Sequence, residues 1–399
     1  MKRLLAMLLS FAMVLGLCAC GSAQPKETEA TQAATVSAPV VLDDSGNSIG
    51  GYKIGFFYLP ESDGLSAQYH RALNFCAELT NCEMEYYDMM NWSAEDLSTA
   101  VETLIANGCQ GIIMITGNSP ALFQYMNEKG VYYTGMTRSY TDEVALVVDG
   151  SEYNCGWLDE NSGLNVDMGY GVTAALAEKG CKNIAYVAGA PGNQMRDDRV
   201  LGIEKAAEEF GMNIVTSYRG SDFASGTADI LATHGAELDG MVGSINGDVC
   251  IAAINSAGYA DTIKYAQIDA PSAEETESYF RTGHIDAVTA GNNVFIVQSY
   301  MQLFNALSGA DRLFNEGNRV YPMIPNFIVS DEEGWQNTEK YTAGDVPALT
   351  PDEILALNSL YTPDTTVEQK EALVEKYCSS EYWNLDSIVA RVKDYLGEN

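Results

Sequence analysis

Short strand-like runs alternate with longer amphipathic runs along most of the chain, and this alternation limits the possible folds more than any other feature. In the first half these runs are YKIGFFYL (52–59), EMEYYDM (83–89), GIIMIT (111–116), VYYTGM (131–136) and VALVVD (144–149). In the second half they are NIAYVAG (183–189), NIVTSY (213–218), GMVGSI (240–245) and IKYAQID (263–269). Strands that alternate with helices form parallel sheets through right-handed crossovers. The sequence therefore predicts an α/β fold.

The chain also contains two segments that resemble each other. NGCQGIIMI (107–115) and KGCKNIAYV (179–187) each end a helix with Gly-Cys and enter an apolar strand two residues later. Helical spacing lies between the strands in both halves, and Ser93 is placed to cap a helix that runs to Asn107. We therefore predict two similar lobes, each built on a doubly wound parallel sheet.

The N-terminus has the pattern of a secretory signal. Residues 2–3 are basic and residues 4–17 are almost wholly apolar, which is too short to span a bilayer. Cys20 follows the small residue Ala19, as in the bacterial lipobox, in which the cysteine after the cut receives a diacylglycerol group. Cys18 fits less well because the bulky Leu17 precedes it. We predict a signal peptide over 1–19 and lipidation of Cys20; the alternative is an ordinary secretory signal with neither thiol modified.

Residues 20–50 are rich in Ala, Thr, Ser, Glu and Pro and contain no aromatic residue. Such a composition buries too little apolar surface to offset the entropy of ordering, so it predicts a flexible tether. The protein is then expected on the extracellular face of the bacterial cell membrane. The formal net charge of −33 argues against binding to nucleic acid, which requires a basic surface.

The cysteines and histidines give no sign of metal or nucleophilic chemistry. Seven of the nine cysteines lie beyond Cys20, and none of them is in a CxxC spacing. The sequence leaves undecided whether Cys76 and Cys82 form a disulfide bridge. The chain has three histidines, and no motif pairs a nucleophile with a base. We expect no cofactor, no metal and no enzymatic activity, although the many acids leave a catalytic carboxylate pair open.

Polar residues follow successive strands in both halves. They occur in PESD (60–63), GNS (117–119), TRS (137–139), APGNQMR (190–196), NGD (246–248), DAPS (269–272) and GNN (291–293). In doubly wound sheets ligands bind beyond the carboxyl ends of the strands. The recurrence of these residues therefore predicts a ligand cleft between the lobes.

The order and spacing of several motifs resemble those of type I periplasmic binding proteins, the ribose- and galactose-type sugar receptors of ABC transporters. The likeness covers about Tyr52 to Asp331 and includes KIGFFYLPESD, TGMTRS, GAPGNQMRDDRVLGIEKA, SINGDVCIAA, AQIDA and GHIDAVTAGNN. The chain departs from the family at Thr137, Gly247 and Gly291, where aspartate, aspartate and glutamine are usual. These departures suggest a ligand other than ribose or galactose.

The resemblance implies a set of ligand-binding residues. A sugar hydroxyl both donates and accepts, so its site needs carboxylate and amide oxygens opposite arginine and amide donors. The implied partners are Asp63, Asn118, Arg138, Arg196, Asn246, Asp269 and Asn292, with Tyr58 or Trp157 as the aromatic face. Arg196 is taken as the second arginine, although its spacing to Gly202 is one residue off the family pattern.

The same resemblance implies the domain layout. An N-terminal lobe would comprise 51–150 and 291–322, and a C-terminal lobe 151–290 and 323–335, joined by crossings at 148–157, 286–292 and 321–329. Residues 336–399 exceed the family core and read as a helical extension that packs on the body, with a capping-box pattern at Thr350 and Glu353.

The implied function is that of a monomeric, lipid-anchored receptor that captures a small polar ligand, foremost a sugar, and delivers it to the permease of an ABC transporter. The alternatives are a nucleoside-binding lipoprotein of related fold and a ligand sensor that docks a membrane receptor.

Overall fold

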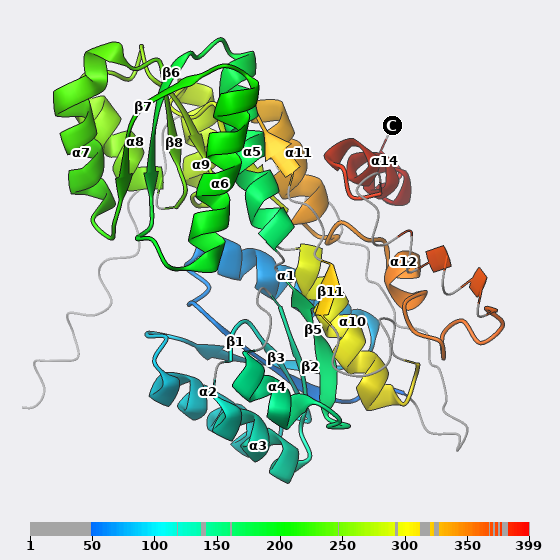
Figure 1. The fold of residues 1–399 in the computed structure, drawn as a ribbon. Helices are drawn as coiled ribbons and strands as arrows, with labels where there is room; N and C mark the ends of the chain where they lie inside the picture. Colours follow the sequence, from blue (N-terminus) through cyan, green and yellow to red (C-terminus); the bar gives the residue numbers. More distant parts are fainter. Residues whose placement is uncertain are drawn as a thin grey trace, which may run out of the picture. The chain divides into compact units, whose positions relative to one another are not determined.

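The computed structural model describes residues 49–117, 119–136, 141–159, 162–245, 247–291, 294–311, 320–322, 327–366, 368–369, 372–373, 376 and 382–398 (Figure 1). The predicted signal peptide, Cys20 and almost all of the tether lie outside these residues. None of the helices in the described part of the chain combines the length and the apolar character that a membrane span requires.

The first sheet has six parallel strands. They are β1 (Lys53–Tyr58), β2 (Glu83–Asp88), β3 (Gly111–Met114), β4 (Tyr132–Gly135), β5 (Asn154–Asp159) and β11 (Val320–Pro322), in the order β11-β5-β4-β3-β1-β2. Its helices are α1 (Gly64–Leu79), α2 (Ala94–Ala106), α3 (Pro120–Lys129), α4 (Asp142–Val148) and α10 (Val294–Ser308). Phe56 packs with α1 and α10, whereas Phe57 packs with α2, α3 and α4. Because successive side chains of a strand point to opposite faces, the helices cover both faces of the sheet.

The second sheet repeats this arrangement. Its strands are β6 (Asn183–Ala188), β7 (Asn213–Arg219), β8 (Gly240–Gly243), β9 (Lys264–Gln267), β10 (Ala287–Ala290) and β12 (Phe327–Val329), in the order β12-β10-β9-β8-β6-β7. The strand β12 is antiparallel to β10, and the other pairs are parallel. Its helices are α5 (Ser162–Glu178), α6 (Gln194–Glu209), α7 (Phe223–His234), η1 (Gly235–Glu237), α8 (Gly247–Ser256) and α9 (Ala273–Thr282). The predicted fold class, two doubly wound sheets, is confirmed. We call each sheet with its helices the first and the second lobe.

One predicted strand is a helix. Residues 142–148 form α4, whose first turn is capped by Thr141. Val144 and Val148 are buried, whereas Leu146 between them is 84% exposed. Burial at a spacing of four is the helical period, and the run of β-branched residues in VALVVD concealed it.

The last long strand of the first lobe is β5, which the strand-like runs did not include. Because β5 pairs with β4 and β11, the chain leaves the first sheet after Asp159. The expected first crossing at 148–157 and the lobe boundary at residue 150 are therefore wrong. The chain passes between lobes again between β10 and α10, since α10 packs on β3, β4 and β5, and between β11 and β12.

The chain continues past β12 into α11 (Glu332–Thr342), α12 (Pro351–Leu355) and α14 (Leu385–Leu396). The expected boundary at 335/336 falls inside α11, so we define the C-terminal extension as residues 332–398. The capping box at Thr350 and Glu353 is present, as predicted. Ile354, Trp383 and Ile388 are buried in the core of the body, so α12 and α14 pack back on it. A further helix is expected over 365–377, and its described residues 368–369, 372–373 and 376 are helical.

Cys76, Cys82, Cys109, Cys181 and Cys250 are free thiols. Cys76, Cys109, Cys155, Cys181 and Cys250 are buried, and Cys82 is half-buried. The sulfur of Cys82 lies 3.6 Å from the carbonyl oxygen of Thr80. The Cys76–Cys82 bridge is therefore not formed.

Candidate functional site

The sequence-predicted site residues fall into two groups. Asn118, Arg138, Asn246 and Asn292 lie outside the described residues. Tyr58, Asp63, Trp157, Arg196 and Asp269 are described, and they come from both lobes. Among the described residues, no cluster of His, Cys, Asp and Glu is arranged to hold a metal ion.

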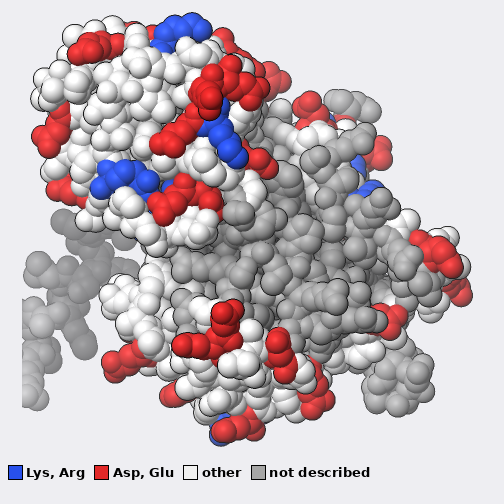
Figure 2. Space-filling model, in the orientation of Figure 1, with Lys and Arg blue, Asp and Glu red and all other residues white. Residues whose placement is uncertain are grey.

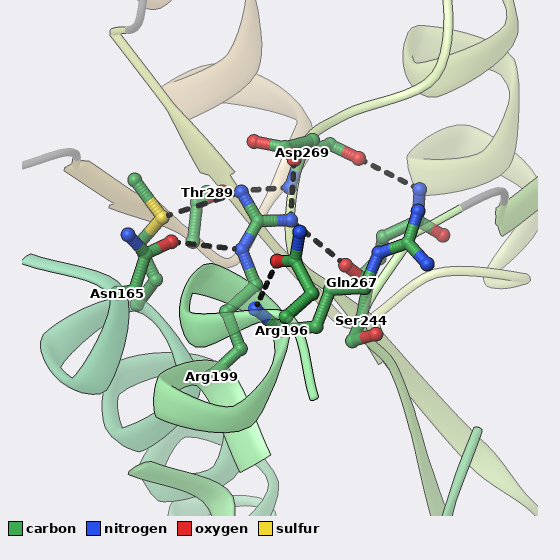
Figure 3. Close-up of polar contacts among 9 residues, drawn as sticks. Asn165, Arg196, Arg199, Ser244, Gln267, Asp269 and Thr289 are labelled. Atoms are coloured by element: carbon green, nitrogen blue, oxygen red, sulfur yellow. Dashed lines mark hydrogen bonds and ion pairs between the residues drawn. The ribbon is translucent and has the colours of Figure 1, made fainter. Parts of the chain in front are cut away.

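An ion pair lies at the carboxyl ends of strands β8 and β9 in the second lobe (Figure 3). The Nη1 atom of Arg199 lies 2.6 Å from Oδ2 of Asp269, and the Arg199 side chain is 5% exposed. Arg199 also donates through Nη1 to the carbonyl oxygen of Ser244 at 2.9 Å and through Nε to Oδ1 of Asn165 at 3.0 Å. A buried guanidinium is stable only when its donors are satisfied, and three elements satisfy this one. The Asp269 side chain remains 31% exposed, so it can still accept bonds from a ligand.

The backbone of Asp269 is held in an uncommon conformation. Its φ is +62°, in the left-handed region that aspartate and asparagine tolerate better than most residues. The hydroxyl of Thr289 accepts from its N–H at 2.8 Å, and Nε2 of Gln267 donates to its carbonyl oxygen at 2.7 Å. These bonds fix the turn after β9, so the carboxylate is aimed before any ligand arrives.

The first lobe contributes Tyr58 and Asp63. Tyr58 ends β1, and Asp63 caps α1 by accepting from the N–H of Ser66 at 3.0 Å. Burial, with a contribution from the charges of Asp63 and Asp269, raises the pKa of the Tyr58 hydroxyl. Gly64, which follows Asp63, lines the same cavity as Asp269 of the second lobe, so this end of α1 lies where the two lobes meet.

Trp157 does not reach this place. Its side chain is 1% exposed and packs in the core of the first lobe against Phe123, at a ring-centroid distance of 6.1 Å. Its ring occupies the space beside Gly135, where an added Cβ would lie 1.9 Å from it. The prediction of Trp157 as the aromatic face of the site is therefore wrong, because a core side chain has no face left for a ligand.

Trp92 is the aromatic residue that sequence reasoning missed. It follows β2 at the same edge of the sheet, its ring lies 5.8 Å from that of Tyr58 in a T-shaped contact, and it is 41% exposed. The neighbouring Met90 is 80% exposed. The signal was present in the sequence DMMNWS (88–93), which places large apolar side chains in a loop.

The arginine that contacts Asp269 is Arg199, and not Arg196 as the sequence suggested. Arg196 lies in the first turn of α6 beside Gly189, and within the described residues its buried Nε atom has no hydrogen-bond partner. Arg199, which the sequence analysis did not select, holds Asp269. The signal for Arg199 was its place on the buried face of α6 with Ile203 and Ala206, since a charged residue on an apolar face needs a buried partner.

A small cavity of about 40 Å³ adjoins Asp269. Its walls come from the first lobe, the second lobe and the C-terminal extension, and they include Gly64, Gln68, Asp269, Thr289, Trp335 and Thr338. An added Cβ on Gly64 would lie 3.0 Å from Cα of Ser272, so the two lobes are in direct contact beside the cavity.

Two largely parallel sheets, with the chain passing three times between them, define the type I periplasmic-binding-protein fold. A periplasmic solute-binding protein of an ABC transporter from Actinobacillus succinogenes, with bound D-allose, superposes with a TM-score of 0.57 at 19% identity, covering 72% of this chain and 99% of that one. An arabinose-binding protein from Geobacillus stearothermophilus gives a TM-score of 0.58 at 18% identity over 72% and 99% of the two chains.

A third solved structure is a solute-binding protein of an ABC transporter from Bacillus halodurans with bound myo-inositol. Its TM-score is 0.54 at 18% identity, and the match covers 73% of this chain and 99% of that one. These neighbours are solute-binding proteins and not enzymes. No protein-family model and no curated protein matches the sequence.

Proposed function

We propose that the protein is a solute-binding protein that captures a sugar between its two lobes and delivers it to the permease of an ABC transporter. The observation that carries this proposal is the Arg199–Asp269 pair, which holds a partly exposed carboxylate in a cavity that Gly64 and Gln68 of the first lobe also line. The described neighbours of the same fold bind D-allose, arabinose and myo-inositol, which are all small polyhydroxy compounds.

The residue types suit a polyhydroxy ligand. Asp63 and Asp269 accept hydrogen bonds from hydroxyls, and Arg196 has a buried donor to offer in return. We include Asn118, Arg138, Asn246 and Asn292 as further amide and guanidinium partners on the resemblance alone. Lobe closure about the three crossings would then surround the ligand.

Charge supports a ligand that is not nucleic acid. Acidic side chains are spread over the visible face of both lobes, and basic groups occur there only at isolated places (Figure 2). With a net charge of −33, the surface repels polyphosphates. A nucleoside has no phosphate, and Tyr58 with Trp92 offers an aromatic face on which a base could stack, so nucleosides are the second candidate ligand class.

A thermal-shift panel of residues 36–399, which form one compact unit, tests the function. The panel contains aldoses, myo-inositol, nucleosides and amino acids. A ligand at about a hundredfold its Kd should stabilise the protein by about 2.7 kcal/mol. A shift with one sugar class supports the proposal. A shift with nucleosides alone would mean that the ligand is a nucleoside and not a sugar. The absence of a shift with every compound of the panel would contradict the receptor function.

The tryptophans give a prediction about where the ligand sits. Of the four, Trp157, Trp335 and Trp383 are 1%, 2% and 1% exposed, whereas Trp92 is 41% exposed. An aromatic face at the rim of a sugar site covers the apolar side of the ring. We therefore expect acrylamide to quench Trp92 selectively and the bound sugar to protect it. The Trp92→Phe variant should keep binding and lose this response; a response that persists in Trp92→Phe would exclude Trp92 from the site.

The anchor is a separate proposal. We propose that Cys20 carries the lipid and that residues 21–50 tether the body to the membrane, because the sequence around Cys20 matches a lipobox. Two acyl chains suffice for stable anchoring, whereas an unmodified secreted chain has none. Cells fed a labelled fatty acid should label the wild-type protein and not the Cys20→Ser variant. Equal labelling of the two proteins would contradict lipid anchoring at Cys20.

A further inference from the structure

The C-terminal extension is attached to the second lobe through the first half of α11. Arg281 of α9 pairs with Glu332, with 3.1 Å between Nε and Oε1. The indole N–H of Trp335 donates to the carbonyl oxygen of Ala273 at 3.2 Å, and Trp335 is 2% exposed. This end of α11 therefore belongs to the second lobe.

The other end of the same helix contacts the first lobe. Nε2 of Gln68 on α1 donates to Oε1 of Glu339 at 2.7 Å. Arg71, one turn further along α1, donates through Nε to the carbonyl oxygen of Ala343 at 2.5 Å and places Nη2 3.9 Å from Oε2 of Glu339. Burial raises the pKa of Glu339, and Arg71 and Gln68 act in the opposite direction. Glu339 is thus a partly desolvated carboxylate whose partners both lie on the other lobe.

The extension then reaches the first lobe a second time. Asn358 of the extension and Asn305 of α10 are both fully buried. The Nδ2 atom of Asn358 donates to Oδ1 of Asn305 at 2.9 Å. Asn305 also donates to the carbonyl oxygen of Leu357 at 2.8 Å. Buried amides are costly unless satisfied, so this pair fixes the extension firmly on the first lobe.

Each end of α11 is therefore held by a different lobe, next to the cavity that Gln68, Asp269 and Trp335 line. Hinge opening would have to break the contacts of α1 with Glu339 and Ala343. We propose that the C-terminal extension is a tie between the lobes, and that Glu339 is a positioning residue that holds α1 against the second lobe and thereby raises ligand affinity. This inference rests on the proposed function for the affinity and on the contacts alone for the tie.

The physical basis is a shift in population. Contacts present only in the closed arrangement increase the fraction of ligand-free molecules that are closed, and the apparent Kd varies inversely with that fraction. The loss of one charge-assisted hydrogen bond corresponds to about a tenfold change in such an equilibrium. Glu339→Ala should therefore weaken ligand binding by about tenfold, mainly through faster dissociation.

Two variants serve as matched controls. Glu277→Ala removes a carboxylate of α9 that accepts from Gln336 of α11 at 3.1 Å, so it leaves the contacts with the first lobe unchanged. The Trp335–Ala273 bond and the Arg281–Glu332 pair still hold that end of α11 on the second lobe. Glu339→Gln keeps an oxygen that accepts from Gln68 and removes the desolvated charge. Should Glu339→Ala fail to fold, Gln68→Ala removes the same contact from the first lobe.

The experiment uses the full chain and two readouts. The first is the radius of gyration of the ligand-free protein by small-angle scattering, which needs no ligand. The second is the dissociation rate of D-allose, L-arabinose or myo-inositol, whichever stabilises the wild type most. The tie predicts a larger radius and faster dissociation for Glu339→Ala, a smaller change in the same direction for Glu339→Gln, and wild-type behaviour for Glu277→Ala.

Equal radii and equal dissociation rates for Glu339→Ala and Glu277→Ala would overturn the tie, since the extension would then act on stability alone. If none of the three compounds binds the wild type, the proposed sugar is wrong, and the radius of gyration still decides the tie.

Discussion

Replacing Arg199 by methionine is expected to lower the free energy of unfolding by about 4 kcal/mol and to abolish ligand binding. Methionine fills much of the same space but removes all the donors. Asp269, Asn165 and the carbonyl oxygen of Ser244 then lose their partner inside the second lobe. Urea unfolding of Arg199→Met beside the wild type measures the loss.

The double variant Arg199→Met/Asp269→Asn is the control for this result. It removes both charges, so it should be less destabilised than the sum of the two single variants. Asparagine tolerates the positive φ at position 269, so backbone strain does not confuse the comparison. Simple additivity, or a loss of less than about 1 kcal/mol in Arg199→Met, would show that the pair is not the centre of the site.

Replacing Gly202 by alanine should destabilise the second lobe by about 3 kcal/mol or more. An added Cβ at Gly202 would lie 2.0 Å from the carbonyl oxygen of Val166 and 2.7 Å from the N–H nitrogen of Tyr170, both in the backbone of α5. Backbone atoms cannot rotate away, so α5 and α6 must separate. The separation would also move Arg199, one turn earlier on α6, away from Asn165 on α5.

Leu201→Ala is the matched control, because Leu201 is the adjacent residue on α6 and is 43% exposed. A surface change of this kind should alter stability by no more than about 0.5 kcal/mol. Thermal unfolding of both variants gives the comparison. A Gly202→Ala protein as stable as Leu201→Ala would mean that α5 and α6 are not as close as described.

Much of the fold could be predicted because apolar periodicity is a local property. The strands β1, β2, β6 and β7 fall within about two residues of their predicted ranges, and Ser93 caps α2 as expected. The prediction of a strand at VALVVD was wrong. Its β-branched residues favour a strand locally, but the segment packs against α3 as a helix. The strand β5 was hidden because Asn154, Cys155 and Gly156 are not a strand-like run.

The site was less predictable because it depends on partners that are distant in sequence. The position of Asp269 after β9 was predicted from the alternation of strands and helices. In the structure its carboxylate pairs with Arg199. This partner was not predicted, since Arg196 and Arg199 lie on the same helix and only packing decides which one points inward. Trp157 and Trp92 show the same limit: an aromatic residue after a strand is core or rim according to the helices that cover it.

The C-terminal extension shows a third case. The capping box at Thr350 announced α12 from local residues. That α11 joins α1 to α9 is not visible in the sequence, because Gln68 and Glu339 are separated by most of the chain.

The central claim is that Asp269, held by Arg199, binds a sugar between the lobes. Calorimetric titration tests it most directly, with the wild type and Asp269→Asn measured beside each other against the sugar that stabilises the wild type most. We predict one binding site in the wild type and at least about a hundredfold weaker binding in Asp269→Asn, because the charged acceptor and its ion pair with Arg199 are lost together. Equal affinities in the two proteins would contradict the account.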